Sequence, residues 1–393
     1  MKFDFYMPAR IKFGPGALDS LGEVRLPGKK ALIVMSAGAS IRRLGYLDRV
    51  IALLEKNGVK TVVFDKIQPN PVESHVMEAA ALARTEGCDF VVGLGGGSSI
   101  DSAKSIAVMA CNPGTYWDYV GGGTGKGRQA SGGALPVVAI TTTAGTGTEA
   151  DPWTVITKPD TKEKIGFGNE HTFPTLSIVD PELMRSVPPA LTAYQGFDAF
   201  FHATEGFIAT CATPMSDLFA LKSIELIARW LPVAVRNGAD LEARTNIAFA
   251  NTLAGLVEST SSCTSEHSLE HALSAHHPSL AHGAGLVMLS VAYYEFFLPR
   301  IPPTLYEQMA TAMGVDVTAH PESERAGLFV TALRALIDEC RLGDLCMSNV
   351  GVVREDLPEI ARNARETMGG LFKLDRYRLS YDDTLRILEN AYR

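Results

Sequence analysis

The stretch DFVVGLGGGSSIDSAK, residues 89–104, joins a short apolar run to a glycine-rich turn and then to a helical pattern. The apolar residues before Gly93 predict a buried strand, and the residues after Ser98 predict a helix. Glycines in such a turn let a diphosphate approach the backbone, and the first helical turn directs amide groups towards it. This turn alone is weak evidence for a nucleotide site, because Ser98 replaces the last glycine of the GxGxxG pattern and the turn does not follow the first strand.

Four further β-rich runs accompany this segment, and helix-like segments separate most of the strands. The runs are residues 31–35, 61–65, 136–141 and 176–180, and the helical patterns between them include residues 47–57 and 76–86. Alternating strands and helices predict an α/β fold with a parallel sheet covered on both faces. After Pro189 the periodicity is helical, with almost no strand signal. Examples of this periodicity are residues 216–235, 241–262, 323–340 and 380–392. We therefore expect a nucleotide-binding α/β domain over residues 1–187 and a helical metal-binding domain over residues 188–393.

A second polar turn, TTTAGTGTE at residues 141–149, follows another predicted strand. It offers hydroxyl and amide groups at the carboxyl edge of the same sheet, where open α/β folds bind ligands. The two turns together predict a nucleotide site rather than two tight glycine turns with helix caps. Its candidate contacts are Gly95, Gly96, Gly97, Ser98, Asp101, Thr142, Thr143, Thr146 and Thr148. A third glycine-rich stretch, residues 121–133, lacks the Ser or Thr that follows a P-loop lysine and is interpreted as a surface loop.

Histidines concentrate in the second half of the chain, where five of the nine lie between His267 and His282. Asp198 and His202 are one helical turn apart, so both side chains point from one helix face. His267 and His271 have the same spacing of four residues. Pro278 should end the helix that carries them, and the chain reaches His282 after the turn that follows. Asp198, His202, His267 and His282 can therefore converge on one divalent cation, and this donor set suits Fe²⁺ or Zn²⁺. His276 and His277 either line this site or lie at a helix end, and a lone histidine is more often a hydrogen-bonded core residue.

Composition narrows the class of protein. The 393 residues exceed one usual core, and 46% hydrophobic with 20% charged residues describes a globular enzyme-like chain. A formal net charge of -8 gives no support for nucleic-acid or anionic-membrane binding, and we expect neither partner. The amino terminus, MKFDFY, alternates like a strand and has no signal-peptide core, so we expect a cytoplasmic protein. Six cysteines without a CxxC pair indicate reduced thiols.

Four segments together resemble the iron-containing, group III alcohol dehydrogenases. They are GGGSSIDSAK (residues 95–104), TTAGTGTEA (142–150), GFDAFFHATEG (196–206) and the stretch from His267 to Gly283. The resemblance covers nearly the whole chain and implies a Rossmann-like domain followed by an all-helical domain, as in the dehydroquinate synthase-like fold. It also implies hydride exchange between a nicotinamide and a small primary alcohol or aldehyde. Asp198, His202, His267 and His282 would be the metal ligands, His271 a non-ligand candidate for proton transfer, and the assembly a homodimer.

The resemblance has one informative departure. Members that prefer NAD tend to carry Asp after the second strand, where it bonds the adenosine ribose, whereas this chain carries Ser36. With Ser40, Arg42 and Arg43 nearby, the loop resembles the branch that uses NADP, so we expect NADP(H) to be favoured over NAD(H). The alternative is that both arginines are ordinary surface charges. Thr148 in place of the usual Ser, and Ala281 in place of Pro, are mild departures.

The sequence also admits other functions. The segment from His267 to His271 spells H-x-x-E-H, the inverted zinc-peptidase motif, in which both histidines bind zinc and Glu270 activates water. This short motif leaves Asp198, His202 and the two nucleotide turns unexplained. Nearer alternatives are a maleylacetate reductase-like or glycerol dehydrogenase-like oxidoreductase. A non-catalytic binding protein would have lost some of the proposed ligand residues, and none is lost in this chain.

Overall fold

The computed structural model describes residues 3–393, which divide into two compact units. The α/β unit comprises residues 7–186, and the helical unit comprises residues 187–393 together with residues 3–6. The first described residues therefore group with the helices, although the sequence placed the whole amino terminus in the α/β domain. The ring of Phe5 lies 6.3 Å from that of Phe219, which provides one such contact.

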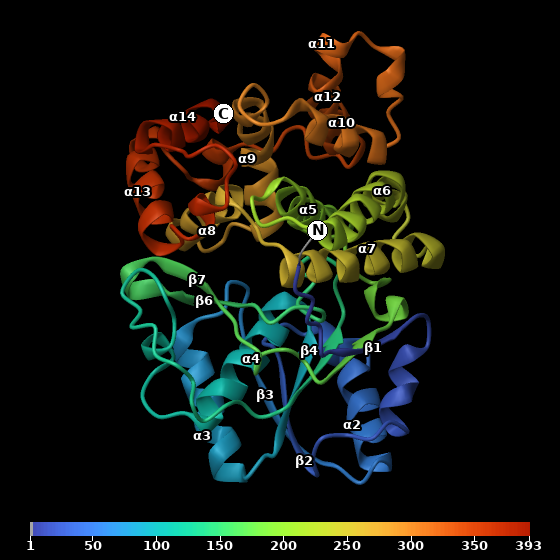
Figure 1. Cartoon of the computed structure of the whole chain (residues 1–393). Helices are drawn as coiled ribbons and strands as arrows, with labels where there is room; N and C mark the ends of the chain where they lie inside the picture. Colours follow the sequence, from blue (N-terminus) through green and yellow to red (C-terminus); the bar gives the residue numbers. More distant parts are fainter. Residues whose placement is uncertain (1–2) are drawn as a thin grey trace. The chain divides into compact units, whose positions relative to one another are not determined.

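The α/β unit is built on a six-stranded sheet in the order β1-β8-β5-β4-β2-β3, and every neighbouring pair is parallel. The strands are β1 (Arg10–Phe13), β2 (Lys30–Ser36), β3 (Lys60–Ile67), β4 (Phe90–Gly95), β5 (Val137–Thr141) and β8 (Leu176–Val179). The helices are α1 (Ser40–Arg43), α2 (Tyr46–Lys56), α3 (Glu73–Glu86) and α4 (Gly97–Cys111). Figure 1 shows α2 on one side of the sheet and α3 and α4 on the other. The predicted parallel sheet with helices on both faces is confirmed.

Burial explains why the central strands read as continuous apolar runs. Ala31, Leu32, Ile33, Val34 and Met35 are all fully buried, as expected for a strand covered on both faces. The helix after β4 packs equally closely. A Cβ added at Gly93 would lie 3.0 Å from Ile100 Cα, so α4 can approach β4 only because residue 93 is glycine.

Three strands of the α/β unit were missed from the sequence. β1 pairs with β8 at an edge of the sheet, and its four residues, RIKF, alternate charged and apolar side chains too briefly to be recognised. The strand-like alternation in residues 3–6 produces no strand, so that expectation was wrong for the described part of the amino terminus. The antiparallel hairpin β6 (Thr154–Lys158) and β7 (Glu163–Phe167) was also missed. The glycine-rich residues 121–133 contain no helix or strand and are largely exposed.

The helical unit contains ten α-helices among its described residues and no strand. They are α5 (Pro189–Ile208), α6 (Pro214–Arg236), α7 (Leu241–Thr260), α8 (Ser265–His276), α9 (His282–Phe297), α10 (Pro303–Ala312), α11 (Glu322–Arg325), α12 (Gly327–Glu339), α13 (Leu357–Thr367) and α14 (Tyr381–Ala391). The helix predicted over residues 323–340 is interrupted at Ala326. Among residues 3–393, no helix combines the length and apolar character needed to cross a membrane.

Aromatic side chains of α5 pack against those of α9 and α12. Phe197, Phe200 and Phe201 are fully buried, and their rings contact Phe329 of α12 and Tyr294 of α9. These phenylalanines therefore belong to the core. They pack the helix that carries Asp198 and His202 against α9 and α12.

Candidate functional site

Three helices of the helical unit bring the predicted metal ligands together. Asp198 Oδ1, on α5, lies 3.6 Å from His267 Nε2 on α8 and 3.3 Å from His282 Nε2 at the start of α9. Donor atoms of these three residues lie within 4.8 Å of one another. Asp198 and His267 are buried, and the His282 side chain is 22% exposed. Among these three residues, His282 is therefore the most accessible to solvent.

His202 belongs to a second group of candidate metal-binding atoms. Its Nδ1 lies 3.7 Å from Asp198 Oδ1, and its ring stacks on that of His267 with centroids 4.4 Å apart. One nitrogen of His202, one of His267 and the Cys263 Sγ lie within 4.8 Å of one another. The four predicted ligands are thus contiguous, and Cys263 adjoins them although no pattern in the sequence singled it out.

Two buried carboxylates bind the outer nitrogens of the histidines. Glu205 bonds to Nδ1 of His267, and Glu270 bonds to Nδ1 of His282. Both glutamates are fully buried. An acceptor at Nδ1 holds the proton there and leaves the Nε2 lone pair of each ring facing Asp198, which is the usual arrangement around metal-bound imidazoles. Sequence reasoning missed both partners, because their role depends on which helices face each other.

Glu205 also fixes the start of α8. Its Oε2 accepts hydrogen bonds from the Thr264 amide at 2.7 Å and the Thr264 hydroxyl at 2.9 Å. Asp375 also binds the start of α8. It accepts hydrogen bonds from the Ser265 amide at 3.3 Å and from the Tyr293 hydroxyl at 3.1 Å. These acceptors satisfy amide groups that a helix amino terminus leaves without an internal partner. Burial raises the pKa of Asp375 to about 7.

The donor set fits a divalent cation. Among residues 3–393, Asp198 Oδ1 and His267 Nε2 are buried and have no hydrogen-bond partner, a cost that an ion would remove. Burial favours the neutral form of Asp198, but the charges of His202 and His282 outweigh it and hold the pKa of that carboxyl well below its usual value. Burial opposes a charge on His267, yet Cys263 and Glu205 raise the pKa of that imidazole well above its usual value. The surroundings therefore favour positive charge at this point, and one carboxylate with three imidazoles suits Fe²⁺ or Zn²⁺.

The remaining histidines of the cluster have different surroundings. His271 is buried one turn after His267; its ring centroid lies 5.3 Å from that of His282, and its Nδ1 contacts Met368 Sδ at 2.8 Å. His276 Nδ1 lies 2.9 Å from the Ala272 carbonyl oxygen at the end of α8. His277 Nε2 lies 3.7 Å from Asp356 Oδ2. His276 and His277 therefore belong to the helix end.

In the α/β unit, the two predicted nucleotide turns follow neighbouring strands and touch each other. The Thr142 amide donates to the Gly95 carbonyl at 2.9 Å. A Cβ added at Gly96 would lie 2.9 Å from Thr143 Oγ1, and one at Gly97 would lie 2.4 Å from Thr146 Cγ2. The turns interlock only because these positions are glycines. No side-chain hydrogen bond caps the start of α4, and a helix amino terminus of this kind can bind an anion.

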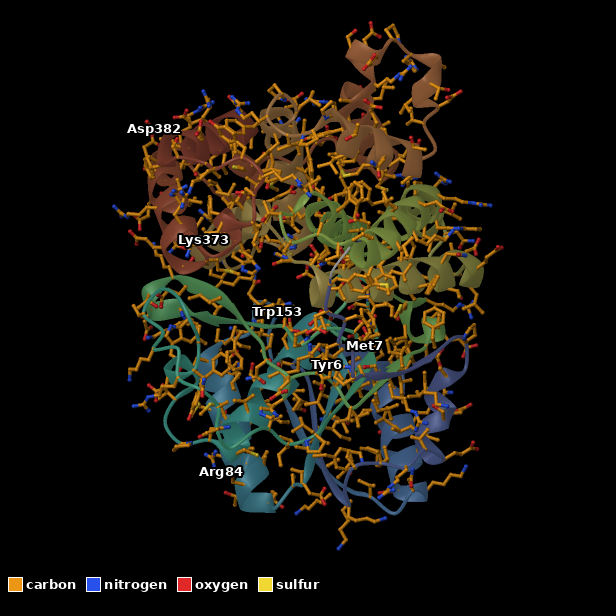
Figure 2. All side chains as sticks on the ribbon, in the orientation of Figure 1. Tyr6, Met7, Arg84, Trp153, Lys373 and Asp382 are labelled. Carbon is orange, nitrogen blue, oxygen red and sulfur yellow. The ribbon has the colours of Figure 1, made fainter. Side chains whose placement is uncertain are left out.

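Asp101 and Thr148 are placed behind the two turns. The Thr148 hydroxyl donates to Asp101 Oδ1 at 2.8 Å, and both residues are buried. Lys104, also fully buried, donates to Thr148 Oγ1 at 2.6 Å and to the carbonyl oxygen of Trp153 at 2.8 Å. Trp153, labelled in Figure 2, precedes β6. This buried network holds the two turns in register, and desolvation raises the pKa of Asp101 to about 6.

The expected cofactor-selecting residues lie where β2 ends. Ser36 is the last residue of β2, and Ser40 is the exposed first residue of α1. Arg42 pairs with Asp65 of β3, and both side chains are about half exposed. Because β2 adjoins β4 in the sheet, its end lies at the same edge as the glycine turn.

Comparisons with known proteins agree with this arrangement. Residues 8–181 match the family model described as iron-containing alcohol dehydrogenase. Residues 192–392 match the model for the carboxy-terminal part of the Fe-containing alcohol dehydrogenase family. The chain belongs to the iron-containing alcohol dehydrogenase family. The predicted family, its fold and its oxidoreductase class are therefore confirmed.

Individual members of the iron-containing alcohol dehydrogenase family match most of the chain. The 1,3-propanediol dehydrogenase of Klebsiella pneumoniae is 34% identical over 366 residues, which cover 92% of each protein. The NAD-dependent methanol dehydrogenase of Bacillus methanolicus is 34% identical over 92% of this chain and 93% of its own length. The crystal structure of an archaeal halo-thermophilic Red Sea brine pool alcohol dehydrogenase, ADH/D1, superimposes with a TM-score of 0.93 at 36% identity. That superposition covers 100% of this chain and 99% of the other.

Membership of this family removes the more distant alternative. A zinc peptidase of the H-x-x-E-H type needs Glu270 to activate water, but Glu270 is fully buried and bonded to His282. In this structure that carboxylate orients a histidine. The peptidase interpretation therefore does not fit.

Proposed function

We propose that this chain interconverts small primary alcohols and aldehydes with a nicotinamide cofactor, using Fe²⁺ or Zn²⁺ held by Asp198, His202, His267 and His282. The observation that carries the proposal is Asp198 Oδ1, buried within 3.3–3.7 Å of three imidazole nitrogens. A divalent ion bound there supplies Lewis acidity for the alcohol or aldehyde oxygen. Glu205 and Glu270 direct the Nε2 atoms of two ligands towards the ion through hydrogen bonds at Nδ1.

The nicotinamide cofactor binds, in this proposal, at the carboxyl edge of the parallel sheet. Gly95, Gly96 and Gly97 let its diphosphate approach the backbone, and the amides at the start of α4 donate to it. Ser98, Thr142, Thr143 and Thr146 supply hydroxyl groups near the same edge. Asp101 and Thr148 contribute as positioning residues, because their side chains bond each other.

His271 is proposed to move the proton that accompanies hydride transfer. Met368 sulfur cannot donate a hydrogen bond, so the contact at 2.8 Å supports a ring proton at Nδ1. The Nε2 lone pair then accepts a proton, and His271 lies one turn from the proposed ligand His267.

We also propose that the cofactor is NADP(H) in preference to NAD(H). Support comes from Ser36, which puts no carboxylate at the end of β2 to repel a 2′-phosphate, and from the exposed Arg43. Arg42 is paired with Asp65, so a phosphate would compete with that carboxylate. The methanol dehydrogenase relative is named as NAD-dependent, so the proposal for this chain rests on its own loop residues alone. The measurement is kcat/KM for NADPH and NADH; comparable values would contradict the preference, and Ser36→Asp should shift it towards NADH.

We propose a homodimer in a reducing compartment, the cytoplasm. All six cysteines are free thiols in the structure, which supports a reducing environment.

The proposal of a dimer rests on the family resemblance. Sedimentation equilibrium at several concentrations tests it, and a monomer throughout would contradict it.

The deciding experiment for the function is metal replacement under anaerobic conditions. The protein is stripped with a chelator and reloaded with Fe²⁺ or Zn²⁺, and nicotinamide oxidation is followed with a panel of short aldehydes. We expect turnover only in the reloaded samples. Metal binding without turnover on any aldehyde would contradict the proposed substrate class and favour a maleylacetate reductase-like reaction, which the same assay with maleylacetate tests.

A further inference from the structure

The turn between α7 and α8 brings a buried thiol to the proposed metal ligands. Cys263 lies four residues before His267, and its exposed fraction is 6%. Its Sγ, one nitrogen of His202 and one nitrogen of His267 lie within 4.8 Å of one another. Donor atoms this close to one another can hold a single metal ion.

The donor set that contains Asp198 and the donor set that contains Cys263 describe one centre. His267 belongs to both sets, and its Nδ1 is bonded to Glu205, which leaves Nε2 as the atom that can bind an ion. One nitrogen cannot serve two ions. The set containing Asp198 and the set containing Cys263 therefore share the one ion that His267 can bind.

We propose that Cys263 is a further ligand of this metal centre and makes it favour Zn²⁺ over Fe²⁺. The inference rests on the proposed function, since it concerns the same ion. A thiolate is a softer donor than a carboxylate or an imidazole, and a softer donor set shifts the preference of a site from Fe²⁺ towards Zn²⁺. None of Asp198, His202, His267 and His282 provides such a donor.

Glu258 can accept the proton that the Cys263 thiol loses when it binds an ion. Cys263 Sγ donates to Glu258 Oε1 at 3.1 Å. When the ion binds, the S–H bond breaks, the sulfur–metal bond forms, and the proton passes to the Glu258 carboxylate. No electron is transferred, so no oxidant or reductant is needed.

Cobalt substitution of the full-length protein tests the proposal. Co²⁺ bound by a thiolate shows a sulfur-to-metal charge-transfer absorption in the near ultraviolet, and we expect this band in the wild type. Cys263→Ser should abolish the band and lower zinc affinity by about tenfold or more, since losing even an outer partner of a ligand costs about 10–100-fold. Iron affinity should fall less. Cys340→Ser is the matched control, because Cys340 is another buried thiol of the helical unit and should keep the band.

A second measurement avoids dependence on a variant that fails to fold. X-ray absorption of the zinc-loaded wild type should show one sulfur neighbour at about 2.3 Å. Metal-dependent turnover without that sulfur neighbour, and with an unchanged cobalt spectrum in Cys263→Ser, would overturn this inference and leave the proposed function standing. Failure to retain any metal would overturn both.

Discussion

Glu270 on α8 is hydrogen-bonded to Nδ1 of His282, the first residue of α9, and this contact joins the two helices at the proposed metal centre. Gly285 makes room for it, because a Cβ there would lie 2.9 Å from Glu270 Cγ. The carboxylate is fully buried, so its orientation is set by packing. The pair shows how a carboxylate from a neighbouring helix fixes the tautomer of one proposed ligand.

Glu270→Ala should weaken metal binding by about 10–100-fold, the usual cost of losing the outer partner of a ligating histidine. Glu270→Gln should lose less metal affinity, because its amide oxygen can still accept a hydrogen bond from His282 Nδ1. Competition with a chromophoric chelator measures both variants. Glu389→Ala, at an exposed position on α14, is the control, and equal affinities of Glu270→Ala and this control would refute the positioning role.

The two histidines one turn apart on α8 should respond differently to replacement. His267→Ala removes a proposed ligand, so metal content and turnover should both be lost. His271→Ala should retain the metal and slow turnover by about 10²–10⁴-fold, the range for a lost proton-transfer group. Metal analysis with single-turnover kinetics distinguishes them. If His271→Ala instead loses the metal, the two roles are reversed.

Gly283→Ala should disturb the start of α9. The new Cβ would lie 2.0 Å from the Tyr194 carbonyl oxygen, a backbone atom that cannot swing away. We expect a loss of about 1–3 kcal/mol in the free energy of unfolding, together with weaker metal binding through the adjacent His282. Urea unfolding measures the first effect.

The matched control for Gly283→Ala is Gly327→Ala at the start of α12, where an added Cβ meets nothing within 4 Å. It should be neutral or stabilising by up to about 1 kcal/mol. If both variants unfold alike, the close contact of Gly283 with α5 does not set the position of α9.

Asp375 should make the stability of the protein fall as pH rises. Burial raises its folded-state pKa to about 7, above the unfolded value of about 3.9. Between these values the folded protein binds more protons than the unfolded chain, so the stabilisation is present below about pH 4 and is lost as pH rises towards 7. The wild type should lose on the order of 4 kcal/mol relative to Asp375→Asn over this range.

Urea unfolding of the wild type and Asp375→Asn at several pH values measures this difference. Asparagine keeps an oxygen that can accept from the Ser265 amide and the Tyr293 hydroxyl, so the variant isolates the effect of ionisation. Parallel stability curves for the two proteins would show that Asp375 does not titrate in this interval.

Local patterns in the sequence determined much of this molecule. The alternation of apolar runs and helical patterns predicted the parallel sheet and the helical half. A strand buried on both faces consists almost entirely of apolar residues, and a helix buried on one face repeats them every three to four residues. Spacing of one helical turn placed Asp198 beside His202 and His267 beside His271. The glycine turn at residues 95–97 was recognisable because only glycine permits that close approach.

The tertiary structure alone decided which distant residues complete these patterns. Glu205, Glu270 and Cys263 reach the histidines only through the packing of separate helices, and Lys104 joins the two nucleotide turns from the interior. Strand β1 and the grouping of residues 3–6 with the helices likewise depend on partners far away in the chain. Such contacts follow from how whole faces pack, and a local spacing of residue types does not record that information.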